Sequence, residues 1–172
     1  MALQDKKVAL LVEDMYNEFE FWYPYYRLKE AGVEVVVVGS GRTSVFQSKL
    51  GMPVTSDVAA DDVAAADFNG VVIPGGYAPD IMRRYPKMVQ LVKEISVSGK
   101  PVATICHAGW MLCSAGIVNG RTVTSFFAIK DDLVNAGAEW VDQAVCIDGN
   151  LITSRTPDDL PVFMKAVLKA LA

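Results

Sequence analysis

The apolar residues of this chain fall into short runs that alternate with longer amphipathic segments. Residues 6–12 form a continuous apolar run of the kind found in buried parallel strands, and residues 33–38 form a second run, rich in β-branched side chains. Between them, residues 18–31 have the pattern of a helix that ends at Gly32 and contains Pro24. The same reading predicts strands at 70–73, 101–105 and 121–124, helices at 88–97, 107–115 and 129–136, and hairpins at 46–55 and 144–154.

Strands and helices that alternate in this way predict an α/β fold with a mostly parallel sheet sandwiched between helices, of the flavodoxin-like, class I glutamine-amidotransferase-like kind. We expect a last helix with Thr156 as its N-cap and Pro157 at its first position. No linker, repeat or low-complexity stretch interrupts the 172 residues, so we expect one domain, residues 1–172. Ligands of such sheets bind beyond the carboxyl ends of the strands, where segments 14–20, 74–80 and 106–107 all fall.

Charge and composition exclude several classes of function. The chain is 52% hydrophobic with a net charge of −4 and no cluster of Lys or Arg, so we expect no nucleic-acid partner. Its longest apolar runs are strand-sized and its start is polar, which predicts no membrane segment, no secretory signal and a cytoplasmic location. A single histidine and scattered cysteines do not suggest a metal site, and we expect no cofactor.

Cys106 is the leading candidate for chemistry. It follows an apolar strand and opens a predicted helix, with Ala103 and Ala108 as small neighbours, which is the layout of a nucleophile elbow. Because a helix N-terminus stabilises negative charge, we predict a depressed pKa for this thiol. Cys113 and Cys146 fall inside a predicted helix and strand, so we interpret them as packing residues.

Other polar groups are expected at the same edge. His107 is adjacent to Cys106 and suits proton transfer, although a lone histidine can also simply cap the helix. Gly75 and Gly76 end a strand, and their N–H groups are candidates for an oxyanion hole together with that of His107. Four acids crowd the first loop and helix, and we interpret most of them as solvated first-turn residues: Glu13, Asp14, Glu18 and Glu20. Glu18 and Glu20 are two residues apart and face different directions, so at most one is expected in the site.

Several segments, in order, resemble the PfpI/ThiJ superfamily of intracellular proteases, glutathione-independent glyoxalases and protein deglycases. Residues 99–107 resemble its cysteine elbow, and residues 73–76 resemble its glycine turn. Glu20 with the segment 24–32 resembles its first helix, and residues 135–140 and 153–160 resemble its C-terminal signatures. The likeness covers nearly the whole chain.

The resemblance implies a role for each matching residue. Cys106 would be the nucleophile, Glu20 the carboxyl group hydrogen-bonded to its sulfur, and His107 the proton shuttle. Asp80 matches an acid that, in the protease-like members, reaches the histidine from a neighbouring subunit. This implies a homo-oligomer with the site near its interface, although Asp80 can also serve as the cap of a short helix at 81–84. The chain departs from the family at Asn17, where several relatives have a second glutamate, and at 108–110, Ala-Gly-Trp in place of the commoner Gly-Pro-Gln.

Three functions follow from these residues. The first is a cofactor-free cysteine enzyme acting on reactive 2-oxoaldehydes or early glycated adducts. The second is a cysteine peptidase with Cys106, His107 and Asp80 of a neighbouring chain. The third is a redox sensor or stress protein in which Cys106 is oxidised without turnover. Glutamine amidotransferases share this architecture but take their histidine from far downstream, and no histidine follows His107 here. The expected substrate is therefore a small aldehyde or a peptide.

Overall fold

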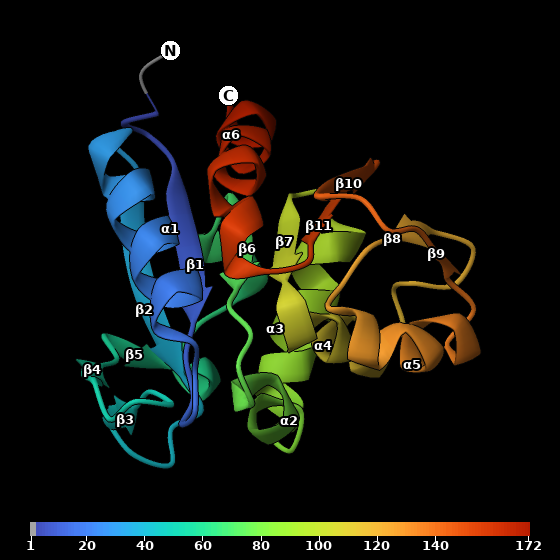
Figure 1. Ribbon diagram of the computed structural model, residues 1–172. Coiled ribbons are helices and arrows are strands. Elements are labelled where there is room, and N and C mark those ends of the chain that lie inside the picture. The colour runs from blue at the N-terminus through green and yellow to red at the C-terminus, as the bar shows by residue number, and fades with distance from the viewer. Residues whose placement is uncertain (1–2) are drawn as a thin grey trace.

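A seven-stranded sheet forms the centre of the computed structural model, which describes residues 3–172 (Figure 1). The strand order is β10–β11–β7–β6–β1–β2–β5, and only the β10–β11 pair is antiparallel. The strands of this sheet are β1 (Lys7–Leu11), β2 (Glu34–Gly39), β5 (Val58–Ala59), β6 (Gly70–Ile73), β7 (Val102–Ile105), β10 (Val145–Asp148) and β11 (Leu151–Ser154). The predicted α/β fold with a mostly parallel sheet is confirmed.

Helices cover both faces of the sheet. Helices α1 (Glu18–Glu30) and α6 (Leu160–Leu171) pack together on one face, and α3 (Pro86–Val97) and α4 (Gly109–Ala115) pack together on the other (Figure 1). The strand order explains the two layers. The chain crosses from β1 to β2 in one direction and from β6 to β7 in the opposite direction, and right-handed crossovers then place the two sets of helices on opposite faces.

The central strands are buried because helices cover them on both sides. Every residue of β6 and β7 is buried, and so are four of the five residues of β1. A strand without a solvent face has no reason to alternate apolar and polar residues. This is why the pattern of continuous apolar runs predicted these strands to within one or two residues.

Smaller elements gather outside the main sheet. The predicted hairpin is present as β3 (Val45–Gln47) and β4 (Pro53–Thr55), which pair only with each other. The strand predicted at 121–124 is shorter, β8 (Thr122–Val123), and forms a separate parallel pair with β9 (Glu139–Trp140). The two-residue strands β5 and β9 were not predicted, because segments of that length carry no periodicity. The remaining helices are α2 (Ala78–Met82) and α5 (Lys130–Asn135).

Two helix starts differ from the prediction. A 3-10 turn, Cys106–Ala108, precedes α4, so Cys106 does not open the α-helix itself. The last helix begins at Leu160 after a 3-10 turn, Pro157–Asp159, and the Thr156 side chain makes no capping hydrogen bond. The Arg155 guanidinium instead donates to Asp159, with an Nε–Oδ2 distance of 2.9 Å. The prediction of Thr156 as the N-cap is therefore right about the position but wrong about the hydrogen bond, which the Thr156 side chain does not make.

No helix within residues 3–172 has both the length and the hydropathy that crossing a bilayer would require.

Candidate active site

Three loops meet at the carboxyl ends of β1, β6 and β7, as the sequence predicted. The loop after β1 is bonded to the loop after β6 in both directions. Asn17 N donates to Gly75 O at 3.2 Å, and Tyr77 N donates to Met15 O at 2.9 Å. The side chain of Glu20 adds a third bond, because its Oε2 accepts from Gly75 N at 2.7 Å. The turn after β7 carries Cys106 against this pair of loops.

Cys106 has the strained backbone of a nucleophile elbow. Its φ is 61°, in the left-handed region that costs a residue with a side chain about 1–3 kcal/mol. The Phe126 N–H donates to the Cys106 carbonyl at 3.2 Å, which helps to hold the turn. Only 9% of the residue is exposed. The thiol is therefore held at a fixed point and is almost fully covered by the surrounding protein.

Gly75 allows Cys106 and Glu20 to approach each other. A Cβ at this position would lie 2.5 Å from Glu20 Oε2, 2.8 Å from Cys106 Cβ and 2.9 Å from the Ile105 carbonyl oxygen. These distances are too short for any side chain. The glycine turn is thus required by the close packing of the site.

Glu20 is a fully buried carboxyl group at the start of α1. Asn17 is the N-cap of this helix, and its Oδ1 accepts from Phe19 N at 3.0 Å and from Glu20 N at 3.3 Å. The departure from the family at Asn17 therefore has a structural role. One Glu20 oxygen is bonded to Gly75 N–H, and the other, Oε1, is buried without a hydrogen-bond partner.

The acids of the first loop are not mainly solvated, so that interpretation is wrong. Glu13 and Glu20 are both fully buried. Glu18 points away from Cys106 and accepts from Leu50 N at 2.7 Å through its Oε1. Asp14 accepts from Gln47 N at 2.8 Å. Of the Glu18 and Glu20 pair, Glu20 alone lies beside the cysteine, in agreement with the helix geometry.

The predicted depression of the Cys106 pKa is wrong. Burial, together with the negative charge of Glu20, raises the pKa of the Cys106 thiol to about 12, and the N–H groups of Gly76 and His107 only partly offset this. Burial likewise raises the pKa of the Glu20 carboxyl group to about 7. The helix-dipole argument fails because a 3-10 turn separates Cys106 from a seven-residue helix, and desolvation dominates.

Cys106 and Glu20 are best described as a pair that shares protons. Below about pH 7 the pair holds two protons, and between about pH 7 and pH 12 it holds one. In the singly protonated state, transfer of the sulfur proton to the carboxylate would leave a thiolate on Cys106. We therefore predict that Glu20 accepts the thiol proton.

We predict that alkylation of Cys106 by iodoacetamide accelerates through about pH 7 and then levels off. The reason is that Glu20 must lose its own proton before it can accept the one from sulfur. Rates measured from pH 5 to pH 10 on the wild type and on Cys106→Ser check this. Glu20→Gln removes the step near pH 7. A wild-type rate that rises only around pH 8.5, the free-thiol value, would contradict the shared-proton model.

His107 lies beside the sulfur in a neutral form. Its Nδ1 is 3.2 Å from Cys106 Sγ. The ring is held between Trp110, at 5.1 Å between centroids, and Phe126, at 5.0 Å. Burial and the positive charge of Lys49 lower the pKa of His107, so the imidazole is uncharged at neutral pH and can accept a proton. Trp110, a departure from the family pattern, therefore shapes the histidine pocket.

The expected oxyanion hole needs a correction at Gly75. Its N–H is already bonded to Glu20 and is not available to a substrate oxygen. The N–H groups of Gly76 and His107 face the Cys106 sulfur and lower its pKa. Gly76 and His107 therefore remain the predicted donors to an oxyanion that forms on an atom bonded to that sulfur.

Among residues 3–172, Asp80 is paired with Arg84 and makes no hydrogen bond to His107. It sits in the middle of α2, where it forms an ion pair with Arg84, and this pair lowers the pKa of the Asp80 carboxyl group. The helix starts at Ala78 with Tyr77 in the N-cap position, so the reading of Asp80 as a helix cap is wrong. The side chain is 28% exposed and remains accessible to a neighbouring subunit.

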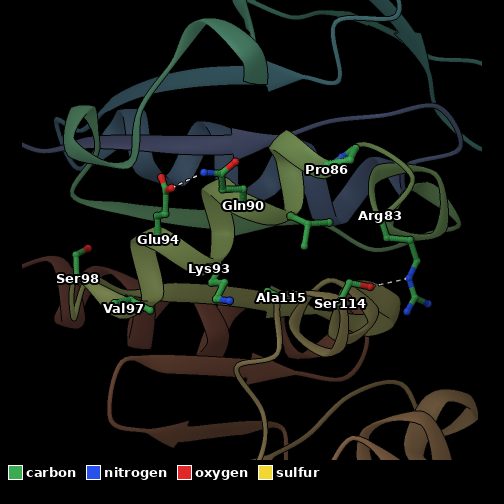
Figure 2. A pocket seen from close by; sticks show the side chains of 10 residues that line it. Arg83, Pro86, Gln90, Lys93, Glu94, Val97, Ser98, Ser114 and Ala115 are labelled. Carbon is green, nitrogen blue, oxygen red and sulfur yellow. Dashed lines mark hydrogen bonds between the residues drawn. The ribbon is translucent and has the colours of Figure 1, made fainter.

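A large hollow on the surface is separate from this site. A groove of about 900 Å³ runs between α3 and the end of α4, lined by residues such as Arg83, Val97 and Ser114 (Figure 2). None of its lining residues belongs to the Cys106 site. Groups of His, Cys, Asp and Glu that could hold a metal ion do not occur among residues 3–172. All three cysteines are free thiols.

Comparison with known proteins places this chain in a family. The model of the DJ-1/PfpI family matches residues 6–170, and the chain belongs to that family. A deglycase of Pyrococcus abyssi is 44% identical over 96% of this chain and 99% of its own length. The Bacillus subtilis protein named "Putative cysteine protease YraA" is 37% identical over 96% of this chain and 98% of its own.

A solved structure confirms the architecture. A two-domain protein of Anabaena variabilis, with DJ-1/ThiJ/PfpI-like and ferritin-like domains, is similar with a TM-score of 0.94 and 44% identity. The match covers 96% of this chain but only 48% of that protein. The chain thus spans about half the length of the two-domain protein.

Proposed function

We propose that this protein is a cofactor-free cysteine enzyme that acts on reactive 2-oxoaldehydes and on early glycated adducts. The observation that carries the proposal is the unpartnered Oε1 of Glu20, buried beside the Cys106 thiol. A carboxylate in a dry site, with a pKa of about 7, is suited to take up and return protons at neutral pH.

The chemistry begins with addition of sulfur to the aldehyde. As the Cys106 thiol proton passes to Glu20, the sulfur electron pair forms a C–S bond, and the carbonyl electrons move onto oxygen. The oxygen takes up a proton, which gives a hemithioacetal. The N–H groups of Gly76 and His107 stabilise the charge on that oxygen as it develops.

A proton shift then converts the adduct into an acyl group. A base, the neutral His107 imidazole or Glu20, removes the proton from the carbon bonded to sulfur, and the same pair of groups delivers a proton to the adjacent carbon. The hydroxyl proton of the hemithioacetal is lost at the same time and the neighbouring carbonyl oxygen gains one. The product is a thioester of a 2-hydroxy acid. Water attacks the thioester carbonyl, the C–S bond breaks, and the thiol of Cys106 is restored. The overall change is addition of one water, so no oxidant or cofactor is required.

The burial of Cys106 favours small electrophiles over long peptides. Cys106 is 9% exposed and the aromatic rings of Trp110 and Phe126 pack against His107. A two-carbon dicarbonyl unit can reach a recessed sulfur more easily than a peptide backbone can. The names of relatives agree with this, since the Pyrococcus abyssi protein is called a deglycase.

The test is to measure loss of methylglyoxal, release of an amine from a glycated model adduct, and cleavage of a peptide on one preparation. Cys106→Ser is expected to abolish every activity. The control is Cys113→Ser, which makes the same chemical change in α4, the helix that follows the Cys106 turn, and it should preserve all activities. Turnover of the peptide but not of methylglyoxal would overturn the proposal.

A peptidase with a site shared between subunits is the second candidate. It is favoured by the partly exposed Asp80 and by the name of the Bacillus subtilis relative. In this reading Asp80 of a neighbouring copy orients His107, as the third member of a triad does. Apolar side chains suited to an interface lie on α1 near the site, where Phe19 is 66% and Tyr26 63% exposed. We therefore propose a homo-oligomer whose interface lies close to Cys106.

The shared site predicts complementation between two inactive variants. Asp80→Ala should lower specific activity in a protein that stays folded, because only an ion pair with Arg84 is lost within the chain. Mixing it with Cys106→Ser should restore part of the activity, since an intact Cys106 and His107 then meet the Asp80 of the other copy. Activity of the mixture is measured after subunit exchange has been verified by mass.

Arg84→Ala is the matched control, because it breaks the same ion pair but leaves the Asp80 carboxylate in place. It should retain activity in the shared-site model. Loss of activity in Arg84→Ala equal to that in Asp80→Ala, or absence of complementation, would refute a catalytic role for Asp80 across subunits.

We also propose the cytoplasm as the place of action. A reactive thiol and two further free cysteines suit a reducing compartment.

A further inference from the structure

The hairpin β3–β4 is bonded to the loop between β1 and α1, which leads directly into the helix that carries Glu20. Met15 N donates to Gln47 O at 2.7 Å, and Lys49 N donates to Tyr16 O at 3.0 Å. The buried Tyr16 hydroxyl donates to Met52 O at 2.7 Å on the far side of the hairpin turn. The tip of the hairpin therefore cannot move independently of the loop between β1 and α1.

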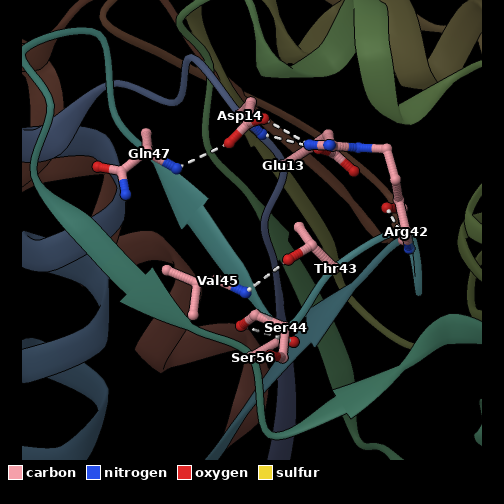
Figure 3. Close-up of polar contacts among 9 residues, drawn as sticks. Glu13, Asp14, Arg42, Thr43, Ser44, Val45, Gln47 and Ser56 are labelled. Carbon is pink, nitrogen blue, oxygen red and sulfur yellow. Dashed lines mark hydrogen bonds and ion pairs between the residues drawn. The ribbon is translucent and has the colours of Figure 1, made fainter.

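An ion-pair cluster secures the other end of this contact (Figure 3). The Arg42 guanidinium pairs with Glu13, at 3.1 Å, and with Asp14. Asp14 in turn accepts from Gln47 N at 2.8 Å. Glu13 is fully buried at the end of β1, so the cluster ties the start of the hairpin to the central sheet. The position of the hairpin tip is thus set by the fold.

This arrangement places Lys49 at the edge of the Cys106 site. Tyr16 forms one backbone bridge with Ser48 and another with Gly76, whose N–H faces the Cys106 sulfur. Ser48 and Gly76 are therefore two strand spacings apart, ~10 Å. Lys49 is the next residue, exposed to solvent, and its flexible four-carbon stem can carry the ammonium group over much of that distance.

The charge of Lys49 acts on both proton-transfer groups. It contributes to lowering the pKa of His107 and partly offsets the effect of burial on the pKa of Glu20. Among residues 3–172, Lys49 is the one cation that lowers the pKa of both Glu20 and His107. A substrate that occupies the space between Glu20, His107 and the solvent must lie within the field of this ammonium.

We propose that Lys49 is a specificity-determining residue that favours substrates with an anionic group next to the reacting carbonyl unit. The chemical class is a 2-oxoaldehyde or glycated adduct with a carboxylate or phosphate substituent. This inference rests on the proposed function and deepens it by naming the charge of the substrate. The ordinary alternative is that Lys49 is a solvated turn residue with no influence on which molecule reaches Cys106.

The test compares two alkylating agents of similar size, anionic iodoacetate and neutral iodoacetamide. Both consume the same thiolate, so the ratio of their rate constants at Cys106 cancels any change in the pKa of the pair. Lys49→Met is expected to lower the iodoacetate-to-iodoacetamide ratio about threefold to tenfold, as expected for one nearby charge in partly aqueous surroundings. Lys49→Glu should lower it further, and Lys49→Arg should preserve it.

Lys93→Met is the control, because Lys93 lines the distant groove between α3 and α4. It removes the same charge from the protein and should leave the ratio unchanged. Raising the salt concentration should reduce the wild-type ratio towards that of Lys49→Met. An equal fall in both methionine variants, or no fall in Lys49→Met, would overturn the proposal.

Substrates give a second readout. The wild type should show a higher kcat/KM for a 2-oxoaldehyde with a phosphate or a carboxylate substituent than for methylglyoxal, and Lys49→Met should reduce this preference. The two anionic substrates, measured separately, decide between carboxylate and phosphate. Absence of methylglyoxal turnover together with a reagent ratio that responds to Lys49 would refute the proposed function alone. An intact turnover with an unresponsive ratio would refute the role of Lys49 alone.

Discussion

Glu20→Gln should reduce kcat/KM for methylglyoxal by about 100-fold or more while the protein remains folded. The amide has the same shape and its oxygen can still accept from the Gly75 N–H, so the fold is preserved. It cannot accept the thiol proton of Cys106 or return one to the adduct, and loss of such a group typically costs a factor of about 10² to 10⁴. Steady-state kinetics and a thermal melt on the same sample provide the measurement.

Glu18→Gln is the matched control, since it makes the same chemical change two residues away on the same helix. Glu18 accepts from Leu50 N on the hairpin and does not face Cys106. The kcat/KM of Glu18→Gln should stay within about threefold of the wild-type value, because substitutions outside the site have small effects on stability and activity. If Glu18→Gln were the inactive variant and Glu20→Gln the active one, our assignment of the proton acceptor would be wrong.

Gly75→Ala is expected to have the second large effect, on stability as well as on activity. The added methyl group would meet Glu20 Oε2, Cys106 Cβ and the Ile105 carbonyl oxygen at less than 3.0 Å. Overpacking of this kind costs typically about 1–3 kcal/mol, and here it also pushes the carboxyl group away from the thiol. We expect a lower midpoint in urea and a loss of turnover of at least tenfold in the fraction that remains folded.

Gly120→Ala separates this steric effect from the general cost of replacing a glycine. Gly120 has a positive φ of 71° and open space around it, so the alanine variant meets only backbone strain of about 1–2 kcal/mol. It should lose some stability and keep its activity per folded molecule. A Gly75→Ala protein with full activity would show that the separation of Cys106 and Glu20 does not matter.

The sequence predicted the central sheet and its helices because strands buried on both faces consist of continuous runs of apolar residues. β6 and β7 are buried on both faces, and their residues are continuous apolar runs. The convergence of the three loops followed from a general property of parallel sheets, which gather strand ends at one edge. Cys106 and Glu20 were found because both fall in those loops and match family motifs.

The sequence was less informative about pKa values and hydrogen bonds that depend on side chains from distant parts of the chain. The pKa of the Cys106 thiol follows from its burial and from the charge of Glu20, which is 86 positions away, and no local pattern contains either. The same holds for Gly75, whose N–H is already bonded to Glu20, 55 positions away. This contact cannot be recognised from residue type and spacing alone.

The amino-acid sequence by itself thus determined the α/β layers and the sheet edge at which the three loops meet, and it singled out Cys106 as the candidate nucleophile. Only the tertiary structure decided that the Cys106 thiol and the Glu20 carboxyl group are buried next to each other, and that the hairpin carrying Lys49 is bonded to the loop between β1 and α1. The physical reason is that strand burial is a local, periodic property, whereas desolvation and charge interaction depend on distances between segments remote in the chain.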